Sequence, residues 1–284
     1  MGNTFLDLYL SFLEGLGHLL PPPKMWPFIH LTGHWYRPGS YKKWEQKVLS
    51  NLAPFFVRPG KILREILHFE MRMALENAFI LRRDQKKIRA CFDHYTWSFP
   101  APCIIICGHF FNYWLLVEAL WQEGQEVVLI LGQEPRASKS SSPVEKRGLK
   151  MWRAWAKRIQ FILREEGQAY EKCAEALAQG KRLFLLVDVP EPKGPQVPFL
   201  KGHASIPTGW LHLAQRFQVP LFGLWPSTPS CLDKYKWRVQ NLGKVSGNAP
   251  RILSQVLAQI EQVALLYPAS WIGWLYLSEL KGNA

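Results

Sequence analysis

The 284-residue chain lacks any cysteine pattern that indicates a metal site or a disulfide framework. Its five cysteines form no CxxC pair and no Cys/His cluster with the spacing of zinc ligands. An odd number of cysteines also fits poorly with complete disulfide pairing. We therefore expect no bound metal and a reducing compartment. The five are Cys91, Cys103, Cys107, Cys173 and Cys231.

Acidic residues are also scarce, since 22 Asp and Glu stand against 35 Lys and Arg and leave a formal net charge of +13. Such an excess attracts anionic partners, including nucleic acid, anionic membranes, acidic proteins and phosphorylated ligands. The 13 tryptophans favour boundaries between apolar and wet surroundings, so charge and Trp content together suggest a membrane surface. We do not expect nucleic acid, because no nucleic-acid-binding motif accompanies the charge.

The N-terminal segment lacks the features of a secretion signal or of a membrane-spanning helix. It has no basic region at its start, and Asp7 and Glu14 interrupt its apolar run. Residues 4–20 nevertheless place apolar side chains on one helical face, which predicts an amphipathic helix ending at the prolines of residues 21–23. Such a helix can lie in a lipid interface or pack on the body of the protein, and both alternatives are open.

The remainder of the chain has the composition of a globular domain, at 48% hydrophobic and 20% charged residues. The sequence pattern of residues 41–95 predicts helices. From residue 101, short apolar runs alternate with helical stretches, which is typical of an α/β sheet with crossover helices. We therefore divide the chain into an amphipathic helix, residues 1–24, and an α/β domain, residues 25–284. The expected strands are 103–107, 127–131, 183–189 and 219–224, and the expected helices are 112–123, 146–160, 166–179 and 207–217.

Two connections rich in Gly and Pro, residues 190–202 and 226–229, follow the ends of expected strands, where α/β sheets usually place their sites. The segment IIICGHFFNYW, residues 104–114, lies at another strand end and delivers Gly108 and His109 to the start of a helix. Imidazole is the side chain most often used as a general base, and this one has backbone N–H donors beside it. This placement suits a general base next to oxyanion donors, although a structural histidine is the simpler alternative.

GHFFNYW resembles the GHFGNWE-type motif of the lipid A biosynthesis acyltransferases, the lauroyl/myristoyl transferase family that acylates a glycolipid at the bacterial inner membrane. The segment LFLLVDVPEPKGPQVPFLKGHASIPTGWLHLAQRF is similar to the family's strand ending in Asp, Gly-containing loop, VPF and following helix. YPASWIGW, residues 267–274, is similar to the closing Pro-x-x-Trp segment, and VLSNLAPFF near residue 50 is like the N-terminal Asn-Leu segment. The resemblance covers most of the chain from about residue 40.

This resemblance implies membership of the lysophospholipid-acyltransferase-like superfamily. The implied fold is glycerolipid-acyltransferase-like: an α/β fold with a mostly parallel sheet flanked by helices and a helical N-terminal part. Members move a fatty acyl group from an acyl-carrier-protein or coenzyme A thioester to a hydroxyl, with no bound cofactor. The implied partners are an acyl carrier protein or CoA thioester, an anionic membrane surface, and a lipid or small-metabolite acceptor. The implied location is cytoplasmic and peripheral on the inner membrane.

The family's catalytic roles can be carried onto the matching positions of this chain. In its His-x4-Asp/Glu motif the His takes the proton of the acceptor hydroxyl while the acidic residue orients the imidazole, which makes His109 the base. Asn112 occupies the motif's Asn and is expected to hold the loop or to contact substrate. Backbone N–H groups near Gly108 and Phe110 are expected to bind the oxyanion.

Further basic residues are candidates for binding the anionic groups of substrates. Arg136 lies in a polar loop after the second strand, where family members carry an Arg that faces the acceptor; a solvated loop is the alternative. Lys201 and Gly202 follow the VPFL segment and can contact phosphates of a head group or of a phosphopantetheine arm.

The chain departs from the family where the acidic partner of His109 should stand, because Trp114 occupies that position and an indole can neither carry negative charge nor accept the imidazole N–H. Three interpretations are open. Glu118, one helical turn beyond Trp114, can approach His109 if the helix start is shifted. Asp188, at the end of a parallel strand, can orient His109 across the sheet edge. Alternatively, the protein is a catalytically impaired homologue that binds an acyl chain, a lipid or an acyl carrier protein.

We favour retained acyl transfer, because positioning and oxyanion donors remain when an orienting group is misplaced. A carboxylate within hydrogen-bond reach of a His109 nitrogen would favour the enzyme. An apolar Trp114 filling that space would favour the binding protein.

Overall fold

The computed structural model describes residues 8, 11–13, 15, 20–33, 41–94, 96–132, 143–228 and 230–282. Its centre is a six-stranded sheet in the order β3-β2-β4-β1-β7-β8, in which every pairing is parallel except that of β7 with β8. This confirms an α/β protein with a mostly parallel sheet. The strands are β1 (Cys103–Cys107), β2 (Val127–Leu131), β3 (Phe161–Leu163), β4 (Arg182–Leu186), β7 (Pro220–Pro226) and β8 (Trp237–Lys244).

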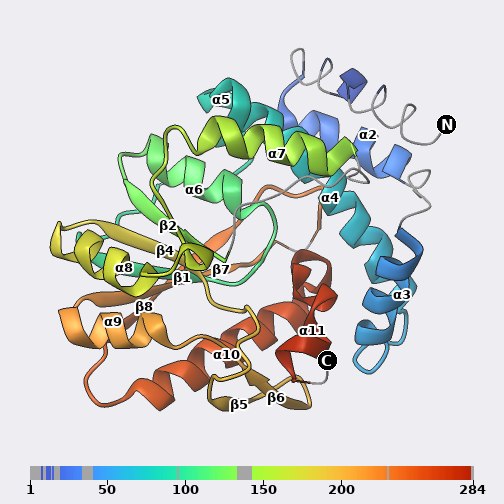
Figure 1. The fold of residues 1–284 in the computed structure, drawn as a ribbon. Helices are drawn as coiled ribbons and strands as arrows, with labels where there is room; N and C mark the ends of the chain where they lie inside the picture. The colour runs from blue at the N-terminus through green and yellow to red at the C-terminus, as the bar shows by residue number, and fades with distance from the viewer. Residues whose placement is uncertain are drawn as a thin grey trace.

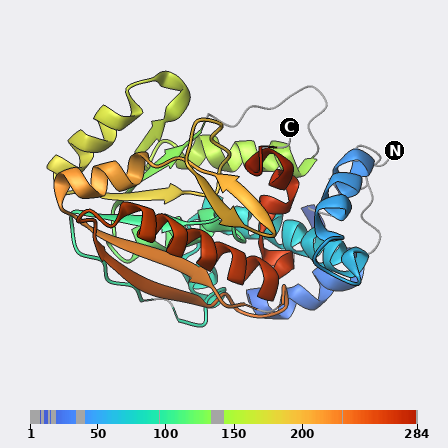
Figure 2. The same ribbon diagram turned by 90° about the horizontal axis from the view of Figure 1, so that it is seen from below.

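Helices cover both faces of the sheet. Figure 1 shows α6 and α7 above it in that view, with α9 and α10 below it. Figure 2 shows α10 lying across the lower face, with a two-stranded hairpin of β5 (Gln196–Phe199) and β6 (Gly202–Ser205) beside it. The helices are α2 (Pro22–Gly33), α3 (Tyr41–Leu52), α4 (Pro59–Arg82), α5 (Gln85–Ala90), α6 (Tyr113–Gln122), α7 (Pro143–Trp155), α8 (Ala169–Ala178), α9 (Gly209–Phe217), α10 (Ala249–Leu266) and α11 (Leu277–Leu280).

The expected strands and helices of the sheet region are present, most of them with shifted ends. The two expected strands at 103–107 and 127–131 match β1 and β2, whose side chains are all buried. The strand expected to end at residue 189 stops at Leu186, so the next residues leave the sheet at its carboxyl edge.

Several elements lack the patterns that would have predicted them. β3 spans only three residues, and β8, at the sheet edge, is largely exposed, so its sequence WRVQNLGK shows no apolar run. The connection at 190–202 was expected as a loop. It contains β5, which pairs with β6.

The N-terminal part matches its expectation only where it is described. Residues 8, 11–13 and 15 are helical, and the other residues of the amphipathic helix expected over 4–20 lie outside the described ranges. Leu20 and Pro21 lie outside any helix, and Pro22 and Pro23 begin α2, because proline is well tolerated in the first turn of a helix. Among the described residues, no helix combines the length and the apolar character that crossing a bilayer requires.

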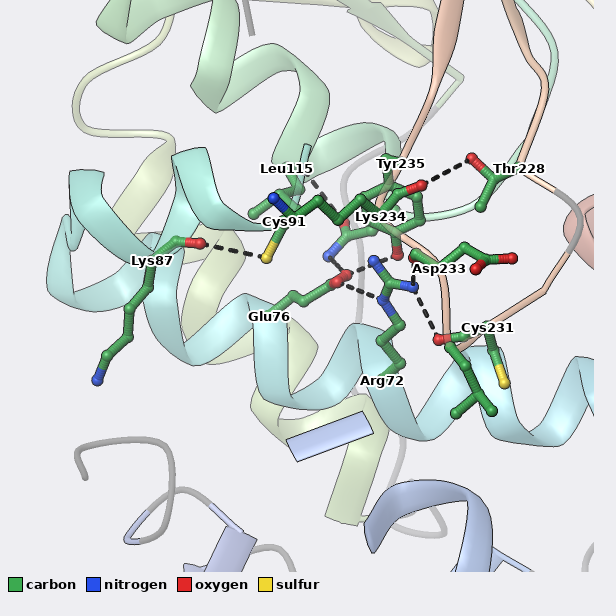
Figure 3. A network of polar contacts seen from close by, with 12 residues as sticks. Arg72, Glu76, Lys87, Cys91, Leu115, Thr228, Cys231, Asp233, Lys234 and Tyr235 are labelled. Carbon is green, nitrogen blue, oxygen red and sulfur yellow. Dashed lines mark hydrogen bonds and ion pairs between the residues drawn. The ribbon is translucent and has the colours of Figure 1, made fainter. Parts of the chain in front are cut away.

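A buried ion pair ties α4 to the segment that precedes β8 (Figure 3). Arg72 Nε donates to Glu76 Oε1 at 2.6 Å, and neither residue is exposed. Arg72 Nη1 donates to the carbonyl oxygens of Cys231 and Asp233 at 2.8 and 2.7 Å. Because a buried charge is tolerated only when it is paired and hydrogen-bonded, this set of contacts fixes the segment against α4.

The same glutamate connects to the start of α6. Glu76 Oε2 accepts from the Tyr235 hydroxyl at 2.7 Å and from Asn112 Nδ2 at 3.4 Å. Asn112 is the N-cap of α6, and its Oδ1 accepts from the backbone N–H of Leu115 at 3.2 Å. The loop that carries His109 is therefore anchored to the buried network of α4.

Candidate active site

His109 and Asp188 meet because two neighbouring parallel strands end in register. β1 lies next to β4, and Cys107 pairs with Leu186 at the last position of each strand. His109 and Asp188 each follow their strand end by two residues, so both emerge at the carboxyl edge of the sheet. Parallel sheets commonly place their sites at this edge.

The two residues are joined by three hydrogen bonds. His109 Nδ1 lies 2.8 Å from Asp188 Oδ1. The backbone N–H of His109 donates to Oδ1 and Oδ2 of the same carboxylate at 3.0 and 2.9 Å. The imidazole is 19% exposed, while the Asp188 side chain is fully buried. Because an ionised carboxylate only accepts hydrogen bonds, Nδ1 carries the proton and Nε2 is left as the basic nitrogen.

Asp188 is held in its charged form despite its burial. Burial by itself raises the pKa of a carboxyl group, but the charge and hydrogen bonds of His109 and the indole N–H of Trp271 outweigh it, so the pKa of Asp188 is below its ordinary value. Trp271 Nε1 donates to Asp188 Oδ2 at 2.7 Å. The site thus contains a fixed partner for an imidazolium, and the lowered pKa favours its negative form.

Two tyrosines pack edge-on against the imidazole. The ring centroids of Tyr113 and Tyr276 lie 5.8 and 5.7 Å from that of His109, in T-shaped arrangements. Burial first, and the negative charge of Asp188 second, raise the pKa of both hydroxyl groups, so they stay neutral. The imidazole is therefore flanked by two neutral aromatic rings.

A cavity of about 400 Å³ opens beside His109, between α8, α9 and the carboxyl ends of β2 and β4. Its walls are mainly apolar, which suits a hydrocarbon chain. Its polar lining includes Arg164, Glu191 and Lys193, and Arg164 Nη2 donates to Glu191 Oε2 at 2.9 Å. The apolar lining includes Ile130, Leu131, Ala169, Cys173, Leu185, Val187, Val189, Pro207, Trp210 and Leu213.

Glu118, one of the two expected acidic partners, bonds elsewhere. Both oxygens of its buried carboxylate face the end of α7, where they accept from Arg158 at 3.2 and 3.1 Å and from Trp155 Nε1 at 2.7 Å. Trp114 packs edge-on against Trp155, with ring centroids 5.0 Å apart. The structure therefore places Asp188, and not Glu118, beside the imidazole, and Trp114 belongs to an aromatic cluster.

Asn112, Gly108 and Phe110 shape the loop around His109. Asn112 is 2% exposed and caps α6, so of its two expected roles the structure shows the holding of the loop. The Phe110 N–H donates to the Gly108 carbonyl at 2.7 Å. This N–H was expected to bind an oxyanion, and in the structure it is already used within the loop. A Cβ at Gly108 would lie 2.6 Å from the Phe110 ring, so only glycine fits there.

Lys201 and Gly202, which were expected to bind phosphate groups, do not line the cavity beside His109. Lys201 and Gly202 lie at the tip of the β5–β6 hairpin, in a separate cavity of about 480 Å³ that also includes Lys281. Lys201 Nζ donates to the Pro54 carbonyl at 2.9 Å. Arg136 lies outside the described residues.

Sequence reasoning missed several residues that the structure brings to the site. Trp271 and Tyr276 come from the end of the chain, and Arg164 and Lys193 come from short connections. Only Trp271 carried a signal, since it belongs to the segment similar to the closing Pro-x-x-Trp of the acyltransferase family.

Neither the protein-family models nor the curated protein sequences give a match to this chain.

Proposed function

We propose that the protein is an acyltransferase with a glycerolipid-acyltransferase-like fold. It moves a fatty or related acyl group from an acyl-carrier-protein or CoA thioester to a hydroxyl or amine of a lipid or metabolite. The observation that carries this proposal is the His109–Asp188 pair at the edge of a largely apolar cavity. A base next to a hydrocarbon-sized cavity is what transfer of an acyl chain requires.

In the proposed reaction, the hydroxyl oxygen or amine nitrogen of the acceptor attacks the thioester carbonyl carbon. Nε2 of His109 removes the proton from that atom during the attack. The tetrahedral intermediate then collapses, the C–S bond breaks, and the imidazolium returns the proton to the leaving sulfur. Asp188 keeps Nδ1 protonated and stabilises the positive ring during both steps.

Asp188 takes the role that an acidic residue five positions after the histidine has in the resembled family. Its carboxylate comes from the neighbouring strand, yet it contacts the same nitrogen that an orienting acid must contact. Trp114 therefore does not remove the acidic partner, because another strand supplies it.

The oxyanion needs donors that are not already used within the loop of His109. The start of α9 lines the same cavity with Thr208 and Gly209. The Thr208 hydroxyl and the first N–H groups of this helix are the donors that we assign to the carbonyl oxygen.

The rim and the overall charge suit anionic substrates and partners. Arg164 and Lys193 line the cavity beside its apolar walls and can pair with a phosphate of the donor or acceptor. The net charge of +13 favours an acidic carrier protein and an anionic surface. We accordingly place the enzyme peripherally on the cytoplasmic side of a bacterial inner membrane.

A catalytically impaired homologue that binds an acyl chain, a lipid or an acyl carrier protein is the second candidate. The engaged Phe110 amide favours it, because a group expected to bind the oxyanion is already bonded within the loop. It uses the same cavity, but it predicts no new covalent product.

Mass spectrometry of lipids and metabolites separates the two candidates. The wild-type protein and H109A are expressed in the same bacterial host, and the extracts are compared. We expect a product heavier by one acyl group only with the wild-type protein. The same products from both proteins would overturn the proposed function.

A further inference from the structure

The closing segment of the chain runs alongside the loop of His109. The N–H of Ile272 donates to the His109 carbonyl at 2.9 Å, and the N–H of Phe111 donates to the Ser270 carbonyl at 2.8 Å. Phe111 has φ of 42°, a conformation that is unfavourable for a bulky residue. The segment therefore holds the loop in a strained shape next to the site.

Trp271 lies in the middle of this segment and is fully buried. Its ring packs edge-on against Trp274 and Phe199, with centroid distances of 4.9 and 5.8 Å. A Cβ at Gly273 would lie 2.1 Å from the Trp271 ring, so glycine is required beneath it. The indole is thus fixed by neighbours on several sides, with its N–H aimed at the carboxylate of Asp188.

The hydrogen bonds of Asp188 show what the indole contributes. Oδ1 accepts from His109 Nδ1 and from the His109 backbone, and Oδ2 accepts from the same backbone N–H. Outside His109, the Trp271 N–H at 2.7 Å is the short contact, while the Tyr276 hydroxyl lies at 3.5 Å, the limit of a hydrogen bond. Within the described residues, Trp271 therefore supplies the strong contact that His109 itself does not provide.

The other titratable groups around Asp188 give it no positive charge. Tyr113, Tyr276 and Cys107 all feel its negative charge, and burial raises the pKa of each of them. Among the described residues that hydrogen-bond to Asp188, His109 is the one that can become a cation. Without the indole N–H, the short hydrogen bonds to the Asp188 carboxylate all come from His109, the residue that the carboxylate must orient.

We propose that Trp271 is a positioning residue for the transfer reaction, which holds Asp188 in its charged form and aims it at His109 Nδ1. Trp271 acts through Asp188 and not on the substrate. Its kinetic consequence rests on the proposed acyl transfer, whereas its hold on the carboxylate does not.

The first test replaces the indole by an aromatic ring without the N–H. In W271F we expect kcat for acyl transfer to fall about 10- to 100-fold, which corresponds to the loss of one hydrogen bond to a charged group. The KM for the thioester is expected to stay unchanged, and the acid limb of the pH profile is expected to move to higher pH.

A matched control is W225F. Trp225 is also buried and donates its Nε1–H to a side-chain oxygen, that of Gln240, at 2.7 Å, and it does not line the cavity. W225F therefore reports the general cost of losing a buried indole N–H. An unchanged kcat and pH profile in W271F, or the same changes in W225F, would overturn the proposal.

A second measurement does not depend on activity. The chain has five aspartates, so side-chain ¹³C labelling of Asp gives few carboxyl signals, and loss of one signal in D188N assigns Asp188. We expect this carboxyl group to titrate at higher pH in W271F than in the wild-type protein, and an unchanged titration would refute the inference. The outcome is different if the Asp188 titration shifts in W271F but the wild-type protein transfers no acyl group. That result would refute the proposed function alone.

A further variant covers the case in which W271F does not fold. G273A retains the indole but forces the ring to move, because the added methyl group would overlap it. We expect the Asp188 signal to shift in the same direction as in W271F. An unshifted Asp188 signal in G273A would count against the role of the indole.

Discussion

The substitution D188N removes the negative charge at the site while it retains the size of the side chain. Asp188 accepts hydrogen bonds on both oxygens, from the His109 ring and backbone and from Trp271. An amide has a single oxygen, so its NH₂ group must face at least one of these donors. The imidazole then loses the group that stabilises its positive form or adopts the wrong tautomer.

The magnitude follows from these two effects. Loss of the carboxylate in a comparable base-orienter pair lowers kcat by about 10⁴-fold, so we expect a loss of about 10³- to 10⁴-fold here. One buried donor without an acceptor costs about 1–3 kcal/mol of stability, which a well-folded domain of this size tolerates. The activity loss should therefore be seen in folded protein.

The assay follows transfer of a radiolabelled acyl group from a thioester donor to a lipid extract, with circular dichroism and urea unfolding as checks on folding. The matched control is D93N, because Asp93 is partly exposed and pairs with Lys236 at 3.4 Å, away from the cavity. A D188N enzyme with a kcat within about threefold of the wild-type value would refute the reasoning, since the pair would then contribute almost nothing.

Three further predictions concern the rest of the molecule. E118Q should lower the free energy of unfolding by about 1–3 kcal/mol, because an amide cannot pair with Arg158 and the Trp155 N–H as the carboxylate does. Urea unfolding measures this loss, and the transfer assay should give a kcat near the wild-type value. The pKa of Asp188 is lower in the folded protein than in the unfolded chain. Its contribution to stability is therefore present above the ordinary pKa of an aspartate and is lost as the pH falls through the folded-state pKa. The free energy of unfolding, measured over an acidic pH series, should show this loss in the wild-type protein and not in D188N. L213W should raise the KM for long-chain thioesters relative to short-chain ones by about 10-fold or more, because Leu213 lines the cavity and a larger side chain shortens it; equal KM changes across a series of chain lengths would contradict an acyl cavity.

The fold was largely predictable because the central strands carry a strong local signal. β1 and β2 are short apolar runs buried along their whole length, and the bounds expected for them match. The edge strand β8 was not predictable, because its identity comes from pairing with β7 and not from an apolar pattern. Pairing partners far apart in the sequence leave no local periodicity.

The candidate site was predictable only in part, for a related reason. His109 stood out because a strand, a glycine and a helix start surround it in sequence. Asp188 was one of the two expected acidic partners, but the choice between them depends on the register of β1 against β4, across 79 positions of the chain, which sequence spacing does not reveal. Glu118 looked suitable by helical spacing, but Arg158 on a distant segment pairs with it.

Two of the site residues that the sequence did not predict, Trp271 and Tyr276, come from the last part of the chain. Tyr276 carried no chemical pattern in sequence, and Trp271 was one of 13 tryptophans with a packing role as the default. Their importance follows from the folding of the closing segment against the loop of His109, which is a tertiary contact.

The most direct test of the central claim is acyl transfer by purified protein carrying H109A. Wild-type protein, incubated with a radiolabelled acyl thioester and extracted bacterial lipids, should yield a labelled lipid product and free thiol in equal amounts. H109A should yield no labelled product above background, because the substitution removes the nitrogen that is proposed to take the proton of the acceptor. Full transfer by H109A, or no transfer by the wild-type protein with either carrier-protein or CoA thioesters, would contradict the account.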